Sequence, residues 1–287
     1  MQTLVFGLVT GAYLVVATLG FALISRVVKF LNIAHAELIS AGAFITYLLN
    51  ARAGWAVVPA ALVAVAAVAL LAVVVARLVY WPIRRASPVV LLITSVGVVY
   101  VIHGAIAAIV KPGTYTYRIA AERTLDLGLF TISDYDLVIV GVAAVCVVAV
   151  HLLLTHTTLG LRMRALASDE ALAAGRGIEV GRSTLHVWLI AGALAGVAGV
   201  LLGLRGALNT DIAFGQILLI LSVSILAGLG SIYGVVAAAL LLGVAMDMST
   251  LVIPPGYRDA IAFLVIILVL LVRPQGLSGA SLRRREA

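Results

Sequence analysis

Apolar residues along the chain form nine long runs separated by short polar segments. Each run approaches the roughly 20 residues that an α-helix needs to cross the hydrocarbon core of a bilayer. The runs cover residues 3–24, 31–50, 55–76, 88–110, 135–154, 184–204, 213–230, 231–250 and 258–272. The seventh and eighth runs form one apolar stretch that is interrupted only at 228–234. We therefore expect an all-α, polytopic bundle of about eight to ten spans, with broken or re-entrant helices.

Composition excludes a soluble globular fold. Of the 287 residues, 64% are hydrophobic and 11% are charged, whereas soluble domains are about 45 to 50% apolar and about 25% charged. The apolar runs continue along the chain with one long polar interruption, at residues 111–134. We therefore expect a single transmembrane domain over residues 1–287.

The charges orient the predicted helices. A net charge of +7 would suggest a nucleic-acid partner in a soluble protein, but here the basic residues lie between apolar runs, where they are retained in the cytoplasm, and we expect no nucleic acid. With the amino terminus outside, thirteen Lys and Arg residues face the cytoplasm and six face the outside. The loop 155–183 and the carboxyl terminus are then cytoplasmic, and 111–134 is the largest external loop.

One polar group interrupts the second apolar run. Asn32, His35 and Glu37 precede the apolar residues 38–49, and an acid at mid-membrane costs about 2.5 to 3.5 kcal/mol on insertion scales. Three interpretations are open: a metal site, a polar helix entry, and a re-entrant element that lines a solute path. His35 and Glu37 are two residues apart and point to different faces of a helix, which disfavours the metal site.

A second interruption contains Gly228 and Gly230. Interrupted segments in both halves of a transporter indicate its binding region in ion-coupled carriers, although no sequence repeat between the halves is evident here. The remaining histidines are predicted to be packing, interface or helix-end residues: His103, His151, His156 and His186.

The loop 155–183 is predicted to contain one short surface helix over residues 161–174, because the segment is rich in Ala and Leu. Four apolar residues can share one face of it: Leu161, Ala165, Leu166 and Leu172. Gly175 and Gly177 are expected to end it. Its charges have both signs, Arg162 and Arg164 against Asp169 and Glu170. This mixture favours docking into a cytoplasmic partner over binding to anionic lipid.

Four blocks of the sequence resemble the permease subunits of ABC importers for branched-chain amino acids, and the closely similar permeases for urea and short amides. The resemblance covers nearly the whole chain. The blocks are NIAHAELISAGAF at 32–44, the loop at 159–183 with its AAGRGI ending, the GLGSIYG segment that begins at 228, and the last helix with VRPQG at 272–276.

The resemblance implies that the chain is the transmembrane permease of an ATP-driven amino-acid importer in the plasma (inner) membrane of a bacterium or archaeon. It also implies a second homologous permease subunit, two cytoplasmic ATPase subunits and an extracytoplasmic solute-binding protein. The chain lacks a Gly-x-x-x-x-Gly-Lys-Ser/Thr motif, which would cradle nucleotide phosphates. We therefore expect no cofactor in this chain, with ATP bound and hydrolysed by the partner subunits.

On this interpretation two groups of residues carry the function. The residues expected to couple the chain to the ATPases are Arg162, Arg164, Asp169, Glu170, Gly175 and Gly177. The residues expected to line the translocation path are Asn32, His35, Glu37, Gly228 and Gly230. The alternatives are a permease for urea or short amides and an ion-coupled secondary carrier that uses Glu37. No catalytic motif points to an enzyme.

Overall fold

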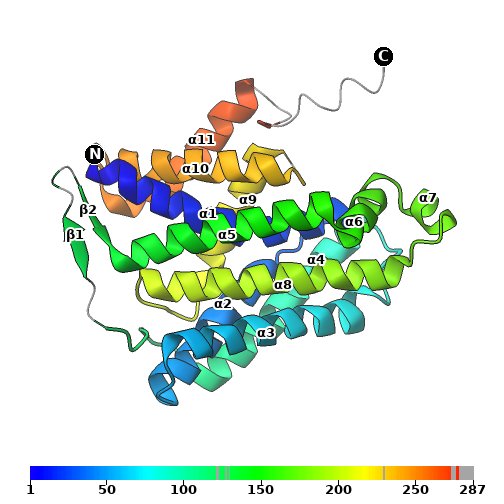
Figure 1. Ribbon diagram of the computed structural model, residues 1–287, viewed down its shortest axis with the longest axis horizontal. Helices are drawn as coiled ribbons and strands as arrows, with labels where there is room; N and C mark the ends of the chain where they lie inside the picture. The colour runs from blue at the N-terminus through cyan, green and yellow to red at the C-terminus, as the bar shows by residue number, and fades with distance from the viewer. Residues whose placement is uncertain (121–122, 127, 129, 229, 273–275, 278–287) are drawn as a thin grey trace.

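The computed structural model describes residues 1–120, 123–126, 128, 130–228, 230–272 and 276–277. Within these ranges the chain forms eleven α-helices and one two-stranded hairpin (Figure 1). The α-helices are α1 (Gln2–Val28), α2 (His35–Tyr47), α3 (Val57–Val75), α4 (Pro88–Val110), α5 (Asp134–His156), α6 (Thr158–Ser168), α7 (Glu170–Gly175), α8 (Val180–Arg205), α9 (Ile212–Ala227), α10 (Ile232–Ser249) and α11 (Arg258–Val272). The antiparallel strands are β1 (Thr124–Asp126) and β2 (Thr131–Ser133).

Every predicted apolar run contains a helix, which confirms a helical membrane protein. Among the described residues, six helices are long and apolar enough to cross a membrane: α1, α3 with the π-helical turn Ala76–Tyr80, α4, α5, α8 and α10. Shorter apolar helices cover 212–227 and 260–269. The helix α2 continues into a second π-helical turn, Leu48–Arg52. The long apolar stretch is interrupted after α9, as the glycines predict.

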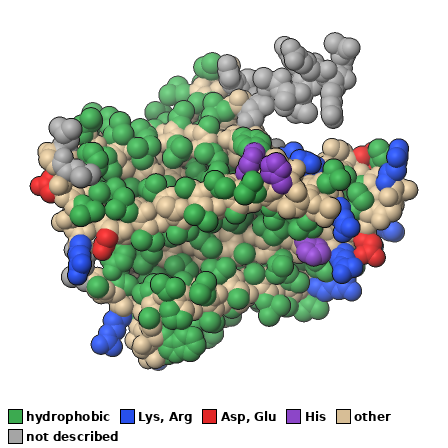
Figure 2. Space-filling view, in the orientation of Figure 1, with side chains coloured by type: hydrophobic (Ala, Val, Ile, Leu, Met, Phe, Trp, Pro, Cys, Tyr) green, Lys and Arg blue, Asp and Glu red, His purple; other side chains and the backbone are tan. Residues whose placement is uncertain are grey.

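The helices lie along one another between two polar ends (Figure 1). At the hairpin end, the Gln2 side-chain amide and the Thr131 backbone exchange two hydrogen bonds of 2.8 Å. The α7 end carries α6 and α7. Figure 2 shows charged side chains gathered near these two ends and a largely hydrophobic band between them. Such a band fits the hydrocarbon core of a bilayer.

The two halves of the chain repeat one arrangement in opposite directions. The long helix α1 is followed by the irregular segment 29–34 and the short helix α2, and the long helix α8 is followed by 206–211 and α9. The helix α1 starts at the hairpin end and α8 starts at the α7 end (Figure 1). This is an inverted repeat, in which short helices begin inside the bundle. The sequence alone did not reveal it.

Glycines bring the helices of the two halves into direct backbone contact. A Cβ atom built on Gly11 of α1 would lie 2.8 Å from the Leu240 Cα atom of α10, and one on Gly196 of α8 would lie 2.8 Å from the Val65 Cα atom of α3. Small residues permit this close approach between membrane helices. These two glycines are therefore helix-packing positions.

The segment between α4 and α5 covers the hairpin end of the bundle. The Tyr117 hydroxyl donates a hydrogen bond of 3.0 Å to the Ala43 carbonyl, and burial raises the pKa of the Tyr117 phenol above its ordinary value, so it remains a neutral donor. The backbones of Tyr115 and Leu208 exchange two hydrogen bonds. The segment thereby ties α2 to the turn between α8 and α9.

The prediction of one helix over 161–174 is wrong. The structure has two helices, α6 and α7, separated at Asp169, whose side chain accepts a hydrogen bond of 2.9 Å from the Leu172 amide. Aspartate is a strong N-cap residue, so it starts a new helix where the helix formers around it would continue the old one. The expected apolar face is also absent, because Leu166 is buried whereas Leu161 and Leu172 are 59% and 62% exposed. The expected end of the helix at Gly175 is confirmed.

The glycine contacts make a stability prediction. In Gly243→Val, the new side chain would enter the contact with α1, because a Cβ atom at this position lies 2.6 Å from the Gly11 Cα atom. Overpacking of this kind costs about 1 to 3 kcal/mol. The matched control is Gly141→Val on α5, where a Cβ atom meets nothing within 4 Å. Thermal unfolding of the purified protein in detergent should show a clear loss for the first variant only, and equal losses would contradict the packing described.

Candidate functional site

The irregular segment 29–34 is partly buried, and side chains of neighbouring helices hydrogen-bond to two of its polar groups. Lys29 has a left-handed φ of 61° and ends α1. The Tyr80 hydroxyl donates a hydrogen bond of 3.0 Å to the Asn32 side-chain oxygen, and the Ile33 amide donates one of 3.2 Å to the Ser95 hydroxyl. Non-helical backbone at membrane depth is tolerated where it is buried in protein or lines a water-filled cavity. Asn32 therefore helps to hold the break in place.

His35 is the first residue of α2 and faces α1. Its Nε2 atom lies 3.1 Å from the Ala17 carbonyl oxygen, and Gly20 makes room for the ring, since a Cβ atom there would lie 2.8 Å from the His35 Cε1 atom. Ala17 is eleven residues before the end of α1, which is about 16 Å along the helix axis. The helix α2 therefore starts deep inside the bundle.

Glu37 faces away from α1, as its spacing from His35 predicts. Its side chain is 1% exposed, and its Oε1 atom lies 3.3 Å from the His103 Nδ1 atom of α4. The His103 Nε2 atom lies in turn 3.8 Å from an Asp211 carboxylate oxygen at the start of α9. Among the described residues, neither carboxylate oxygen of Glu37 has a hydrogen bond. We call Glu37, His103 and Asp211 the acidic cluster.

The acidic cluster reaches from the interior of the chain to its outer surface. The side chain of His103 is 23% exposed, and that of Asp211 is 77% exposed. His103 lies seven residues before the end of α4, so it is about 10 Å inside that end of the helix. Polar side chains at such a depth face a protein neighbour or a water-filled cavity, because contact with lipid is costly.

The pocket beside Glu37 is otherwise apolar. It has a volume of 20 Å³ and lies between α2, α4 and α9. Its other lining residues are Ile33, Ala36, Val99, Ala213, Phe214 and Ile217. The Phe214 ring also contacts the His103 ring edge to face, with 5.9 Å between ring centroids.

Gly228 and Gly230 lie at the other end of α9 from this pocket. Both have a left-handed φ, 87° and 79°, which glycine adopts without steric cost. A Cβ atom on Gly230 would lie 3.1 Å from the Arg26 Cβ atom of α1, and one on Gly276 would lie 2.7 Å from the Gly228 nitrogen. The structure therefore does not bring these glycines together with the acidic cluster.

The residues predicted for coupling lie together at the α7 end. Arg162, Asp169 and Glu170 are exposed, and Asp169 also caps α7. A groove of 250 Å³ runs between α6, α7 and the following turn. Its lining residues are Ala165, Ser168, Asp169, Leu172, Ala173, Arg176 and Ile178. Gly177 has a left-handed φ of 82° in that turn.

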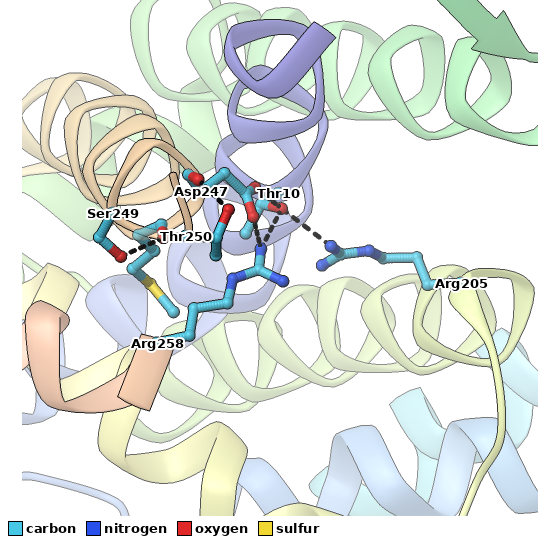
Figure 3. A network of polar contacts seen from close by, with 7 residues as sticks. Thr10, Arg205, Asp247, Ser249, Thr250 and Arg258 are labelled. Carbon is cyan, nitrogen blue, oxygen red and sulfur yellow. Dashed lines mark hydrogen bonds and ion pairs between the residues drawn. The ribbon is translucent and has the colours of Figure 1, made fainter. Parts of the chain in front are cut away.

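A second polar network, near the hairpin end, joins four helices (Figure 3). Thr10 of α1 donates a hydrogen bond of 2.6 Å to Asp247 of α10 and accepts two of 2.8 Å, from Arg205 of α8 and Arg258 of α11. Arg258 also forms an ion pair with Asp247. Sequence reasoning missed this network, although Asp247 was a visible signal, since it is an acid within a predicted span.

Comparison with known proteins identifies relatives over nearly the whole chain. A family described as "Branched-chain amino acid transport system / permease component" matches residues 3–270. The permease LivH of Escherichia coli K12 is 26% identical over 294 residues, covering 97% of this chain and 95% of its own. BraD of Pseudomonas aeruginosa is 28% identical with the same coverage. A probable LivH of Methanocaldococcus jannaschii is 27% identical over 214 residues, 70% of this chain and 67% of its own. No solved structure matches the chain.

The network around Thr10 makes a second stability prediction. Asp247→Ala removes the carboxylate of the ion pair and leaves Arg258 and Thr10 without this acceptor, which should cost about 1 to 3 kcal/mol. The control is Glu179→Ala, which breaks an exposed pair with Arg182 at 3.9 Å and should change stability by at most about 1 kcal/mol. Denaturation in mixed micelles measures both, and a loss in the control as large as in Asp247→Ala would count against the buried network.

Proposed function

The chain belongs to the permease components of branched-chain amino acid transport systems, and we propose that it is a transmembrane subunit of an ATP-driven importer for these amino acids. The family match over residues 3–270 carries this proposal. The acidic cluster supports it, because ionisable groups within a membrane domain mark solute or ion pathways. The location is the plasma membrane of a bacterium or archaeon.

In this proposal the hairpin end is external and the α7 end is cytoplasmic. The count of thirteen basic residues against six supports this orientation. The two ends lie at opposite poles of the bundle (Figure 1). The six long helices, together with α2, α9 and α11, would make nine membrane-inserted segments.

Two cytoplasmic ATPase subunits would act on the importer, one of them through α6 and α7 of this chain. Leu161 and Leu172 are largely exposed on these helices, and exposed apolar side chains beside a groove are typical of a contact with another protein. Arg162 and Glu170 supply charges of both signs on the same surface. ATP is bound and hydrolysed by the ATPases, and this chain carries out no catalysis.

The second permease subunit would cover the face formed by α4 and α9. His103 and Asp211 are partly open on this face and need a neighbour other than lipid. Gly104 of α4 and Gly215 of α9 have open space where a Cβ atom would be, so a helix of the partner could approach closely. The translocation path would lie between the two subunits, with Glu37 in its wall. An extracytoplasmic binding protein would deliver the solute at the hairpin end.

Transport would follow alternating access. ATP binding favours one of two conformations of the whole complex, and only such differential binding can shift the equilibrium between them. Movement of α6 and α7 would pass to the bundle through α5 and α8, which flank them in the chain, and would open the path to one side at a time.

The proposed function predicts ATP-dependent uptake. Proteoliposomes that contain this chain, its second permease and the ATPases should accumulate leucine, isoleucine or valine when ATP and the binding protein are supplied. The chain alone should accumulate none. Uptake by the chain alone under an ion gradient would indicate a secondary carrier that uses Glu37, and uptake of urea or acetamide in place of amino acids would indicate an amide permease.

The coupling surface makes a separate prediction. Replacing Asp169 and Glu170 together by Lys should lower uptake at least about tenfold while ATP hydrolysis persists. A tenfold loss corresponds to about 1.4 kcal/mol of weakened contact between this chain and the ATPase. Asp169→Asn keeps the helix cap and removes the charge, whereas Asp169→Ala removes both and costs about 0.5 to 2 kcal/mol of helix stability. The control is Glu179→Lys, outside α6 and α7. Unchanged transport in the double variant would contradict this coupling role.

A further inference from the structure

We propose that the Glu37 carboxylate binds the ammonium group of the transported amino acid, while the apolar walls beside it contact the aliphatic side chain. This inference rests on the proposed function and adds the residue that binds the ammonium group of the substrate. It rests on three observations: the state of the carboxylate, the chemistry of its pocket, and its connection to the outer surface.

The carboxylate of Glu37 is buried with one close ionisable partner among the described residues, the His103 imidazole. Its side chain is 1% exposed, and among the described residues no Lys or Arg forms an ion pair with it. The imidazole of His103 is near one oxygen only, at 3.3 Å, and no hydrogen bond satisfies either oxygen. A buried carboxylate normally accepts several hydrogen bonds or faces a fixed cation. The second oxygen is therefore left for a further partner, and a cation with N–H donors is the one that a carboxylate binds best.

The apolar walls of the pocket indicate that the rest of this cation is a hydrocarbon skeleton. Apart from Glu37, the lining consists of aliphatic side chains and Phe214. A carboxylate beside an apolar pocket complements an ammonium group attached to a hydrocarbon skeleton. It does not complement an isolated carboxylate, which it repels, and it gives a neutral amide no charge to pair with.

The pocket must widen before an amino acid enters. Its volume is 20 Å³ in this conformation, which is room for about one water molecule and too little for an amino acid. One side of the pocket is α9, whose Phe214 is 48% exposed and contacts His103. A shift of α9 away from α4 would therefore open the pocket towards the face that we assign to the second permease.

His103 can serve either of two carboxylates during this change. Its Nδ1 atom faces Glu37 at 3.3 Å and its Nε2 atom faces Asp211 at 3.8 Å. When the substrate ammonium reaches Glu37, the imidazole can turn to Asp211, so that Glu37 exchanges one partner for another. His103 is thus a positioning residue, and Glu37 is the one that contacts the substrate.

The first test measures import by the complete transporter in proteoliposomes with saturating binding protein. Glu37→Gln keeps the size of the side chain and removes its charge. We expect a loss of leucine import of about tenfold to a hundredfold, because a hydrogen bond to a charged group is lost, with thermal stability unchanged. Glu37→Asp should recover part of the import. The matched control is Ser40→Ala, which alters another buried polar side chain of α2 and should import normally.

The second test uses the wild-type permease complex without binding protein, so it does not depend on how a variant folds. Saturation-transfer NMR should show that leucine and leucinamide, which carry an ammonium group, compete for one site. The competitor 4-methylpentanoate, which has a carboxylate and no ammonium, should not displace them. Equal competition by 4-methylpentanoate, or absence of leucine binding at millimolar concentration, would overturn the inference.

The outcomes separate this inference from the proposed function. Normal leucine import by Glu37→Gln would overturn the role of Glu37 and leave the importer assignment intact. Failure of the wild-type complex to import any branched-chain amino acid would overturn the proposed function itself.

Discussion

The structure depends on one constraint: a chain inside a bilayer must satisfy its own backbone polar groups, because hydrocarbon offers none in exchange. This chain nevertheless has irregular backbone before each of its two short helices α2 and α9, at 29–34 and at 206–211. Each break is covered by side chains or strands from elsewhere. Tyr80 and Ser95 serve the first break, and the backbone of Tyr115 serves the second through Leu208. The breaks are therefore stable parts of the fold.

Close packing decides where the short helices begin. The backbone of α2 crosses α8 at two glycines: a Cβ atom on Gly42 would lie 3.0 Å from the Gly196 Cα atom, and Gly199 faces the α2 backbone at Ala43. With Gly20 admitting the His35 ring on the opposite side, α2 is held between α1 and α8. The first turn of α2, which carries Glu37, is therefore fixed deep inside the bundle. Glu37 in a first helical turn is also favoured by the helix dipole, which offsets part of the cost of its burial.

Local signals in the sequence predicted where the helices lie, but they did not predict which side chains of different helices contact one another. Hydropathy locates the runs because each helix needs about 20 apolar residues to span the membrane, and glycines mark the end of α7 and the break after α9. The break between α6 and α7 also has a local signal, since Asp169 is a strong N-cap within an Ala-rich segment, although the helix propensity of that segment predicts one continuous helix. The sequence could not predict the contact between Glu37 and His103, because 66 positions separate them and only the tertiary fold brings α4 against α2. The same holds for Thr10 and Arg205.

The helix α9 connects the regions that a transport cycle has to link. Asp211 of the acidic cluster immediately precedes α9, and Phe214 in its first turn contacts His103. The end of α9 at Ala227 meets the glycines that contact Arg26 and Gly276. Its neighbours are constrained, because α1 is in backbone contact with α10 and α8 with α3, whereas a Cβ atom on Gly215 of α9 would meet nothing within 4 Å. The helix α9 follows an irregular segment, is followed by glycine hinges, and has one open face. It can therefore move with less disruption than the helices around it. The acidic cluster and the open face of α9 are thus two parts of one arrangement, in which the group that needs a cation lies beside the element that is free to admit one.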